Sequence, residues 1–301
     1  MSESVAEFNA AALPWALPRE RHVLIAGPTA SGKSALALAI AERAGGVIVN
    51  ADAMQVYEGW RLLTARPPPE ETARLPHRLY GHVPFEGRYS AGDWLRDMRP
   101  LLESGERLIV VGGTGLYFTA LTEGLAAIPP VPETVRAEAG ARLAAGGAGA
   151  LLGGIDTRTR AAIDTANPAR IRRAWEVQRA TGRGLADWQA LTPPPLLAPG
   201  EATALVIEIP PAALAARIEA RFDAMLRAGV LDEVRANLGR LARAPLAGRA
   251  IGAADLAACL EGRMPLEAAR TAAITATCRY AKRQRTWMRN RLAAWQRIIL
   301  D

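Results

Sequence analysis

One segment of the chain combines the residue types that are needed to bind phosphate groups. Residues 27–34 fit the phosphate-binding-loop pattern of a glycine, four residues and then Gly-Lys-Ser/Thr. In such a loop the backbone N–H groups converge on phosphate oxygens, and the following helix adds the positive end of its dipole. Lys33 would supply a point charge for the terminal phosphate, and the Ser34 hydroxyl could ligate Mg²⁺. The predicted diphosphate- or nucleotide-binding residues are Gly27, Pro28, Thr29, Ala30, Ser31, Gly32, Lys33 and Ser34.

Lysine is rare in this sequence. Of the 37 basic residues, only Lys33 and Lys282 are lysines, and the others are arginines. A compositional bias toward arginine would explain the count, and so would a need for a compact ammonium group at these two positions. The motif around Lys33 favours a functional role for that residue, whereas the count alone decides nothing for Lys282.

Further polar residues follow two predicted strands. Asp52 opens a loop that should face the phosphate site, and its carboxylate could cap a turn, ligate Mg²⁺ or act as a general base. Gln55 and Tyr57 on the same loop could recognise a planar heterocycle or could hold the loop in place. Thr114 lies among the glycines of segment 112–117, where the backbone must approach another group closely.

The segments around these groups predict an α/β fold. Segments 23–26, 46–51 and 107–112 are short apolar runs typical of buried parallel strands, and 35–42 reads as a helix. Ligands of parallel sheets bind beyond the carboxyl ends of the strands, so the three loops that follow should converge. The third strand lacks the acid with which a phosphate-loop ATPase often ends this strand, which argues against a simple ATPase.

Beyond residue 128 the chain no longer alternates strand and helix as it does before. Segment 129–199 loses the strand pattern and ends in a proline-rich linker, so it predicts a helical insertion domain. A strand returns at 204–209, and the chain then reads as helical to its end. An apolar stripe at helical spacing, ended by Gly229, consists of Leu214, Ile218, Phe222 and Met225. The predicted architecture is a P-loop NTPase-like parallel sheet flanked by helices (21–128 and 200–301), with an inserted all-helical domain and a helical C-terminus.

Two helical segments concentrate arginine. In segment 167–176, Asn167 is placed to cap a helix, Ile171 and Trp175 form an inward pair, and the arginines lie on neighbouring faces. Segment 279–291 interleaves arginines with two aromatic residues, a combination that suits an RNA backbone and unstacked bases. A solvated basic helix is the simpler alternative for this second segment.

Composition narrows the class of protein. The chain has 301 residues, a net charge of +7 and a pI near 10.1, which together suggest a polyanionic partner. Cys259 and Cys278 show neither paired nor metal-ligand spacing, as in a reducing compartment. Glu3 and Glu7 precede any basic residue, which argues against a signal peptide, and no apolar run approaches the ~18 residues of a membrane span. We therefore expect a cytoplasmic protein that does not insert in membranes, with a monomer as the default.

Several motifs, in their order along the chain, resemble those of the tRNA dimethylallyltransferases (isopentenyl transferases). The resemblance extends from about residue 21 to residue 291. It depends on the motifs jointly, because the phosphate loop alone is common. The motifs are segment 27–34, Asp52 with Gln55 and Tyr57, and segments 112–117, 170–177 and 277–287.

The resemblance implies transfer of a dimethylallyl group from dimethylallyl diphosphate to the exocyclic amine of the adenosine 3′-adjacent to the anticodon of tRNA, with Mg²⁺ as cofactor. The phosphate loop would then hold the diphosphate leaving group, stabilised by Lys33 and by the metal on Ser34. Asp52 would accept the proton of the attacking amine, and Thr29 would face the reacting centre. Arg217 and Arg221 match basic family positions near the active site, and we place Arg217 in the catalytic group.

The same resemblance implies a tRNA-binding surface. The target adenosine is stacked in the anticodon stem-loop and would have to flip out to reach the site. The insertion domain would embrace the anticodon loop. The implied tRNA-binding residues are Asp52, Ala53, Met54, Gln55, Thr114, Arg136, Ala169, Arg170, Ile171, Arg172, Arg173, Lys282 and Arg283.

The sequence departs from the family pattern at four places. His77-Arg78 replaces a usual pair of histidines, Asn167 replaces an aspartate, segment 251–255 lacks its usual ending, and Cys278-Arg279 replaces Arg-Gln. None of these positions is in the phosphate loop or at Asp52, so they affect the expected tRNA affinity rather than the chemistry. The absence of a zinc-finger extension beyond residue 301 fits a bacterial form.

Two other classes of protein remain as alternatives. A small-molecule kinase would use the same loop and fold with ATP as donor and Asp52 as the base. It leaves the helical insertion and the arginine-rich C-terminal helix unexplained. A non-catalytic RNA-binding protein would not need the intact Lys33, Ser34 and Asp52.

Overall fold

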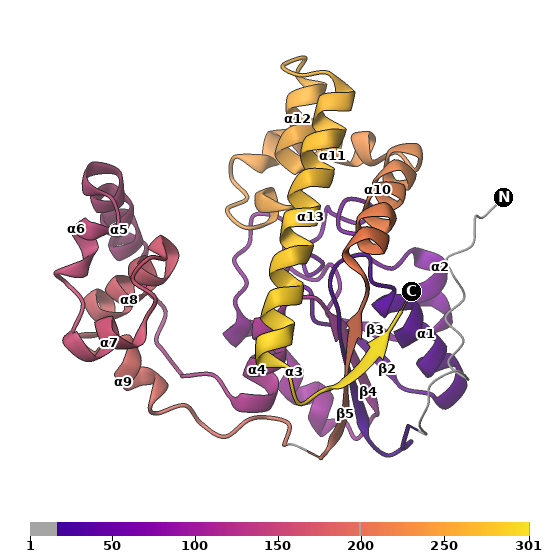
Figure 1. Ribbon diagram of the computed structural model, residues 1–301, viewed down its shortest axis with the longest axis horizontal. Coiled ribbons are helices and arrows are strands. Elements are labelled where there is room, and N and C mark those ends of the chain that lie inside the picture. The colour runs from indigo at the N-terminus through magenta and orange to yellow at the C-terminus, as the bar shows by residue number, and fades with distance from the viewer. Residues whose placement is uncertain (1–16, 199, 301) are drawn as a thin grey trace. The chain divides into compact units, whose positions relative to one another are not determined.

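The core of the protein is one six-stranded parallel sheet. The computed structural model describes residues 17–198 and 200–300, and the sheet order is β3-β2-β4-β1-β5-β6 (Figure 1). The strands are β1 (His22–Ala26), β2 (Val47–Asn50), β3 (His77–Arg78), β4 (Leu108–Gly112), β5 (Ala202–Glu208) and β6 (Gln296–Ile299). The predicted P-loop NTPase-like α/β fold is thereby confirmed.

The central strands are apolar because both faces of the sheet are covered. Every residue of β4 and the last four of β1 are buried, as expected for a parallel sheet with helices on both faces. Ala26 lies opposite Gly112 in the register, so these two strands end at the same level. Helix α1 (Lys33–Ala44) buries Leu36 and Ile40 in the hydrophobic core of the sheet.

The prediction of a helical C-terminus is wrong for the last residues. Helix α13 (Leu266–Arg291) is followed by β6, which extends the sheet by pairing with β5. Only Ile298 of this short strand is buried, so no apolar run marks it in the sequence. Strand β3 was also missed, because two residues at the edge of a sheet carry no periodic signal.

Helices of the C-terminal half build a second core beside the sheet. Helix α10 (Pro211–Arg227) buries the predicted apolar stripe, and Gly229 at φ 91° separates it from α11 (Val230–Leu241). The 26 residues of α13 correspond to a length of about 39 Å. The helix is buried at Ala269 and Ala273 beside α12 (Ala253–Leu260), and its later turns reach the phosphate loop.

Three further helices come from residues 69–123, before the helical insertion. Helix α3 (Ala91–Glu103) begins with a capping box at Ser90, and its Trp94 is fully buried. The others are α2 (Pro69–Arg74) and α4 (Gly115–Glu123). No helix in the described part of the chain has both the length and the apolarity needed to cross a membrane.

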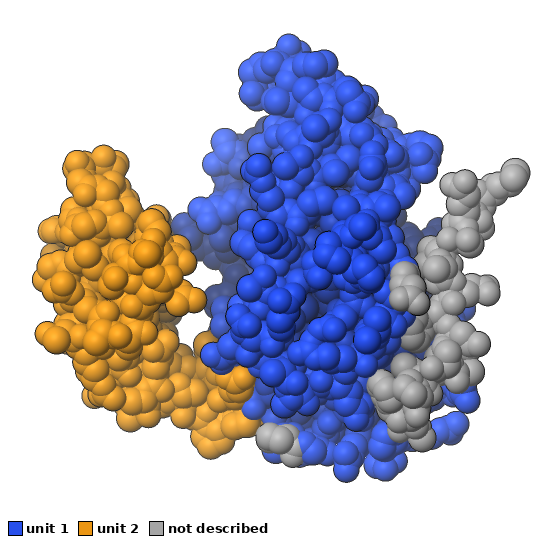
Figure 2. All heavy atoms as spheres, viewed as in Figure 1, with its two compact units in different colours: residues 1–122, 197–301 blue, residues 123–196 orange. Residues whose placement is uncertain are grey.

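The chain divides into two compact units. Unit 1 contains residues 1–122 and 197–301, and unit 2 contains Glu123–Leu196 (Figure 2). The sequence predicted this insertion, with bounds at 129 and 199. Residue 199 lies outside the described residues, and so do Glu3 and Glu7, on which the argument against a signal peptide rested. At the base of the insertion, the Leu197 N–H donates to the Leu121 carbonyl at 3.2 Å, so the two ends of unit 1 that flank the insertion are adjacent.

Unit 2 is all-helical and has its own core. Ile171 and Trp175 of α8 are buried in this core, as the spacing predicted. The Asn167 side chain accepts from the N–H groups of Ala169 and Arg170, and Pro168 occupies the first turn. The helices are α5 (Glu133–Gly146), α6 (Gly149–Leu152), α7 (Thr157–Ala162), α8 (Pro168–Thr181) and α9 (Leu185–Gln189).

The Asn167 cap gives a stability prediction for unit 2. Asn167→Ala should lower the free energy of unfolding by about 1 kcal/mol, because two N–H groups of the first turn lose their acceptor. Denaturant unfolding followed by tryptophan fluorescence would measure the change. Thr165→Ala, at an exposed neighbouring position, is the control and should change little. Equal stability of the two variants would contradict the prediction.

Candidate active site

The phosphate loop joins β1 to α1 in a tight turn. The Ser31 N–H donates to the Pro28 carbonyl at 3.2 Å, and the loop needs left-handed backbone at Ala30 (φ 63°) and Gly32 (φ 87°). Glycine adopts that conformation at little cost, which explains its presence just before α1. The loop is also tied to the neighbouring strand, because the Gly27 N–H donates to the carbonyl at the end of β4 at 3.3 Å.

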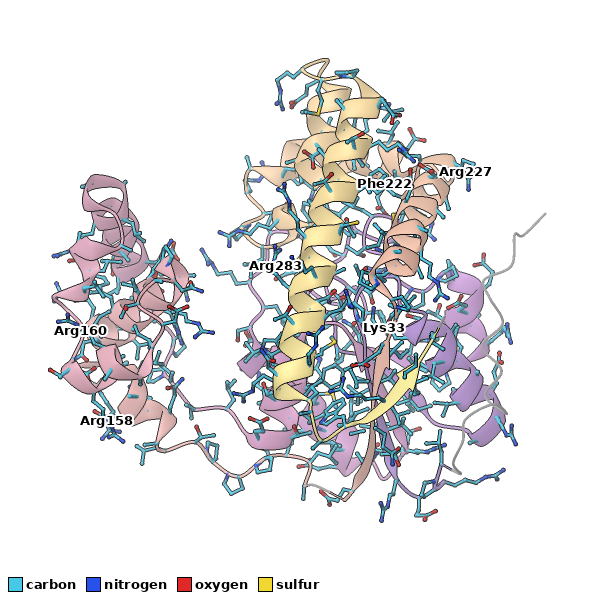
Figure 3. The ribbon with its side chains drawn as sticks, in the orientation of Figure 1. Lys33, Arg158, Arg160, Phe222, Arg227 and Arg283 are labelled. Atoms are coloured by element: carbon cyan, nitrogen blue, oxygen red, sulfur yellow. The ribbon has the colours of Figure 1, made fainter. Side chains whose placement is uncertain are left out.

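Lys33 is the first residue of α1, and Figure 3 shows its position beside α10 and α13. Its ammonium donates to the Pro28 carbonyl at 3.4 Å. Burial lowers the pKa of Lys33 to about 8; the negative charge of Asp52 opposes this effect, and the positive charge of Arg221 adds to it. The site is therefore short of negative charge, and a bound anion would restore the proton affinity of Lys33.

The lowered pKa of Lys33 predicts how donor binding depends on pH. The ammonium is retained below about pH 8 and is lost as the pH rises through that value. Affinity for a diphosphate ligand should therefore be constant below pH 8 and about tenfold weaker at pH 9. Titration calorimetry between pH 7 and pH 9.5 would measure this. Lys33→Arg, whose charge does not titrate there, should flatten the profile, and a flat profile in the wild-type protein would refute the assignment.

Thr29 is held at both its backbone and its side chain. Its N–H donates to Oε1 of Gln284 on α13 at 2.9 Å, and its Oγ1 accepts from Nη2 of Arg221 on α10 at 2.7 Å. Because Oγ1 accepts from the guanidinium, the hydroxyl hydrogen stays available for a ligand in the loop. Burial lowers the pKa of Arg221, and the charge of Asp52 partly offsets that effect.

The sequence placed Arg217, rather than Arg221, in the catalytic group. Both arginines lie on α10, one turn apart, so they share one side of the helix. The hydrogen bond to Thr29 is made by Arg221. The structure thus gives Arg221 the position in contact with the phosphate loop, whereas the role of Arg217 stays a prediction.

Asp52 follows β2, and the buried Asn50 fixes its backbone. The Asp52 N–H donates to Asn50 Oδ1 at 2.8 Å, and Asn50 Nδ2 donates to the carbonyls of Asp52 and Leu79, both at 3.0 Å. Oδ1 of Asp52 accepts from the Met54 N–H at 2.9 Å, so the carboxylate caps a turn. Its other oxygen has no hydrogen-bond donor among the described residues. That oxygen can accept a proton, so turn capping and general-base function are compatible.

The charge of the Asp52 carboxylate acts on two cations and three phenols. Its charge affects the pKa values of Lys33 and Arg221, which places both cations near it. It also contributes, after burial, to raising the pKa values of three tyrosines, so their hydroxyls stay neutral. These tyrosines are Tyr80, Tyr117 of α4 and Tyr280 of α13.

Sequence reasoning gave the three tyrosines no role beside Asp52. Tyr117 and Tyr280 could have been found because both lie in motifs that resemble those of the family. Tyr80 lies outside these motifs, and only the unusual sequence after His77-Arg78 draws attention to it. Asn50 was also missed, although a polar residue that closes an apolar strand is a usable signal.

The third loop follows β4 and contacts both of the others. Thr114 Oγ1 accepts from the Ala53 N–H at 2.9 Å, and the Thr114 N–H donates to the Ala51 carbonyl at 3.1 Å. The glycines are needed for close approach: a Cβ would lie 2.0 Å from the Ala51 oxygen at Gly112 and 2.2 Å from the Trp287 ring at Gly115. The predicted convergence of the three loops is confirmed.

Gln55 and Tyr57 hold the loop after β2. Nε2 of Gln55 donates to the carbonyls of Thr64 and Ala65, at 2.8 and 3.0 Å. Tyr57 is 1% exposed and lies in the second hydrophobic core. Of the two alternatives for these residues, the structure shows the loop-holding one.

The donor set fits magnesium in the way that phosphate-loop sites use it. Among the described residues, no group of three or more His, Cys, Asp or Glu side chains could hold a metal ion. Ser34 presents an exposed hydroxyl at the start of α1. Mg²⁺ is commonly held by one or two protein groups together with substrate phosphates and water, so a single hydroxyl beside the loop is adequate.

A pocket of about 280 Å³ opens beside the phosphate loop. Its lining is largely apolar; α13 contributes Arg285 and Arg289, one turn apart, and β5 contributes Glu208. The lining residues are Pro28, Val206, Ile207, Glu208, Ile209, Pro210, Arg285, Met288, Arg289 and Ile299.

The residues expected to bind tRNA in unit 2 differ in exposure. Arg170 and Arg173 are exposed, whereas the Ile171 side chain is 1% exposed and is not available to RNA. Arg172 is committed within the unit, because it pairs with Glu176 at 2.7 Å and donates to the Arg136 carbonyl at 3.2 Å. This ion pair is only partly at the surface, since Glu176 is buried.

The α13 residues of unit 1 that were expected to bind tRNA are on the solvent side of the helix. Lys282 and Arg283 are exposed, as is Arg279, and Arg283 extends from the helix in Figure 3. The Arg283 guanidinium carbon lies 5.8 Å from the centre of the Tyr280 ring. Because Tyr280 is near Asp52, the exposed basic face begins one helical turn from the active-site cluster.

Comparisons with known proteins identify the family of this chain. The family profile described as IPP transferase matches residues 55–291, and the profile described as isopentenyl transferase matches residues 20–82. The tRNA dimethylallyltransferase of Cereibacter sphaeroides is 59% identical over 284 residues, which cover 94% of this chain and 90% of that protein. The tRNA dimethylallyltransferase of Roseobacter denitrificans is 58% identical over 276 residues, which cover 92% and 98%.

A solved structure agrees as well. The full-length tRNA isopentenylpyrophosphate transferase from Bacillus halodurans matches with a TM-score of 0.66 at 31% identity, covering 94% of this chain and 91% of that one. The resemblance inferred from the motifs is confirmed along most of the sequence. The chain belongs to the IPP transferase family.

Proposed function

We propose that this protein transfers a dimethylallyl group from dimethylallyl diphosphate to the exocyclic amine of the adenosine 3′-adjacent to the anticodon of tRNA. The observation that carries the proposal is the arrangement of charge around Asp52. A carboxylate with an uncommitted oxygen lies near Lys33 and Arg221, and Arg221 contacts the phosphate loop at Thr29. The names of the relatives supply the substrates, a tRNA and a prenyl diphosphate.

The donor half of the site suits a diphosphate leaving group. In the reaction the bond between the allylic carbon and the diphosphate oxygen breaks, so negative charge grows on the diphosphate. Lys33, Arg221 and the Thr29 hydroxyl are donors already in place for that charge. Mg²⁺, bound to Ser34 and to the diphosphate, would neutralise part of the charge. The three cationic or polar side chains need no reorganisation as the bond breaks.

The acceptor half of the site suits an amine. The adenosine nitrogen forms the new bond to the allylic carbon, and its proton passes to the free carboxylate oxygen of Asp52. The Asn50 hydrogen bonds fix the backbone beneath this carboxylate, so the base is held in one position. The phenols of Tyr80, Tyr117 and Tyr280 stay neutral beside this charge, so none of them competes with Asp52 as the base.

The exposed arginines and Lys282 support tRNA as the partner. Lys282 and Arg283 would bind the backbone beside the active site, and Arg136, Arg170 and Arg173 of unit 2 would grip the anticodon stem-loop. The segment 52–55 and Thr114 would receive the flipped adenosine. The enzyme would act on tRNA in the cytoplasm and as a monomer.

One incubation tests donor, acceptor and reaction type together. The purified protein is mixed with Mg²⁺, dimethylallyl diphosphate and unmodified tRNA, and the tRNA is then digested and analysed by mass spectrometry. A prenylated adenosine in the fragment beside the anticodon is the expected result. No prenylated product, together with consumption of added ATP in the presence of a small metabolite, would instead identify a kinase.

A further inference from the structure

The side chain of Gln284 on α13 connects two of the active-site loops. It is 6% exposed. Its Oε1 accepts from the Thr29 N–H of the phosphate loop at 2.9 Å, and its Nε2 donates to the Gly113 carbonyl of the third loop at 2.8 Å. We call this pair of hydrogen bonds the Gln284 bridge. One amide thus joins segments that are 255 and 171 positions away from it in the sequence.

The two ends of the Gln284 bridge lead to opposite halves of the reaction. Thr29 carries the hydroxyl that contacts Arg221 on the donor side. Gly113 precedes Thr114, whose hydroxyl holds the Ala53 N–H next to Asp52 on the acceptor side. The Gln284 bridge therefore links the Arg221 contact with Thr29, on the leaving-group side, to the Thr114 contact with Ala53, beside the base.

The surroundings of Gln284 leave little room for another arrangement. A Cβ at Gly113 would lie 2.2 Å from Nε2 of Gln284, so the third loop approaches the amide as closely as a glycine allows. The Thr29 N–H is occupied by Gln284 and is therefore not available to a phosphate oxygen. The amide fixes the orientation of Thr29 rather than contacting substrate.

We propose that Gln284 is a positioning residue that sets the distance between the diphosphate at Thr29 and the base at Asp52. This inference rests on the proposed prenyl transfer. A displacement at carbon needs the nucleophile, the carbon and the leaving group in line, and small losses of alignment lower the rate steeply. Gln284 acts on the rate through Thr29 and Gly113, so its loss should affect kcat more than substrate affinity.

The first test removes both hydrogen bonds at nearly constant volume. Gln284→Met should lower kcat about 100-fold while the KM for tRNA changes less than about twofold. Thr277→Val is the matched control: this residue is also buried on α13, and its hydroxyl bonds only within the helix, to the Ala273 carbonyl. Thr277→Val should keep the wild-type kcat. Equal kcat values for Gln284→Met and the wild type would overturn the proposal.

The second test uses protonation to restore the bridge. In Gln284→Glu, a neutral carboxyl group could accept from Thr29 and donate to Gly113, whereas the ionised form would repel the Gly113 carbonyl. Burial raises the pKa of such a group. The ratio of the variant kcat to the wild-type kcat should therefore rise as the pH falls from 8 to 6. A ratio close to one at every pH would show that the residue only fills space.

A measurement without substrate separates this proposal from the proposed function. Hydrogen exchange of the peptides that contain Thr29 and Gly113 should be faster in Gln284→Met than in the wild type and unchanged in Thr277→Val. Unchanged exchange in Gln284→Met would show that the bridge does not hold the loops. If the wild-type protein failed to prenylate tRNA while the exchange behaved as expected, the proposed function would fall and the bridge would remain.

Discussion

Asp52→Asn is expected to lower the kcat of prenyl transfer about 10³-fold, within the range that loss of a general base causes. The substitution keeps the Oδ1 acceptor for the Met54 N–H and the backbone bonds to Asn50, so the turn should stay intact. The ability to take the proton of the amine is lost, together with the negative charge that opposes the lowered pKa of Lys33. Single-turnover prenylation of tRNA, followed by mass spectrometry, would measure the rate.

The control for this variant must match its change in charge. Glu103→Gln removes one exposed carboxylate at the end of α3, before β4 begins, and should leave both rate and tRNA affinity unchanged. The affinity of Asp52→Asn for tRNA, measured by filter binding, should also stay within about twofold of the wild type. A loss of affinity as large as the loss of rate would show instead that Asp52 recognises tRNA.

The second large effect is expected from Arg221→Met, which should reduce kcat about 10²- to 10³-fold by removing a donor to the developing diphosphate charge. The methionine stem preserves much of the packing, but Thr29 Oγ1 loses its hydrogen bond. Dimethylallyl diphosphate should also bind more weakly. Rates at saturating donor and titration calorimetry with the donor would measure the two effects.

Two further variants of α10 locate the catalytic arginine. Arg227→Met, at an exposed position of the same helix, should have little effect. Arg217→Met tests the assignment that the sequence suggested, and the structure predicts a smaller loss there than at Arg221. The reverse order of effects would restore Arg217 to the catalytic group and reduce Arg221 to a support for Thr29.

The sequence predicted most of the elements that a local pattern specifies. The phosphate loop, the strand before it and the helix after it lie within about twenty residues, and a motif together with apolar runs describes them fully. The apolar stripe of α10 and the Asn167 cap were predictable for the same reason. The place of Asp52 in the loop after a buried strand was predictable for the same reason, whereas its role as the base was implied only by the family resemblance.

The parts that could not be predicted depend on tertiary contacts. The bonds of Gln284 and the choice between Arg217 and Arg221 depend on how α10 and α13 pack against loops far away in the sequence. Periodicity places both arginines on one side of a helix but does not say which turn meets Thr29. Strand β6 likewise exists only because β5 offers it an edge, and its four residues carry no pattern of their own.

Because Leu121 and Leu197 are adjacent, unit 2 could be deleted and the two flanking ends of unit 1 joined directly. Since a backbone hydrogen bond already joins the two cut ends, a linker of a few glycine and serine residues could replace Glu123–Leu196 at little cost in loop entropy. The sheet, the second core and all three active-site loops belong to unit 1, so the shortened protein should fold and still bind dimethylallyl diphosphate. Such a protein would keep the prenyl-diphosphate site but lack the domain proposed to bind tRNA, and a different binding domain could be inserted at the same position.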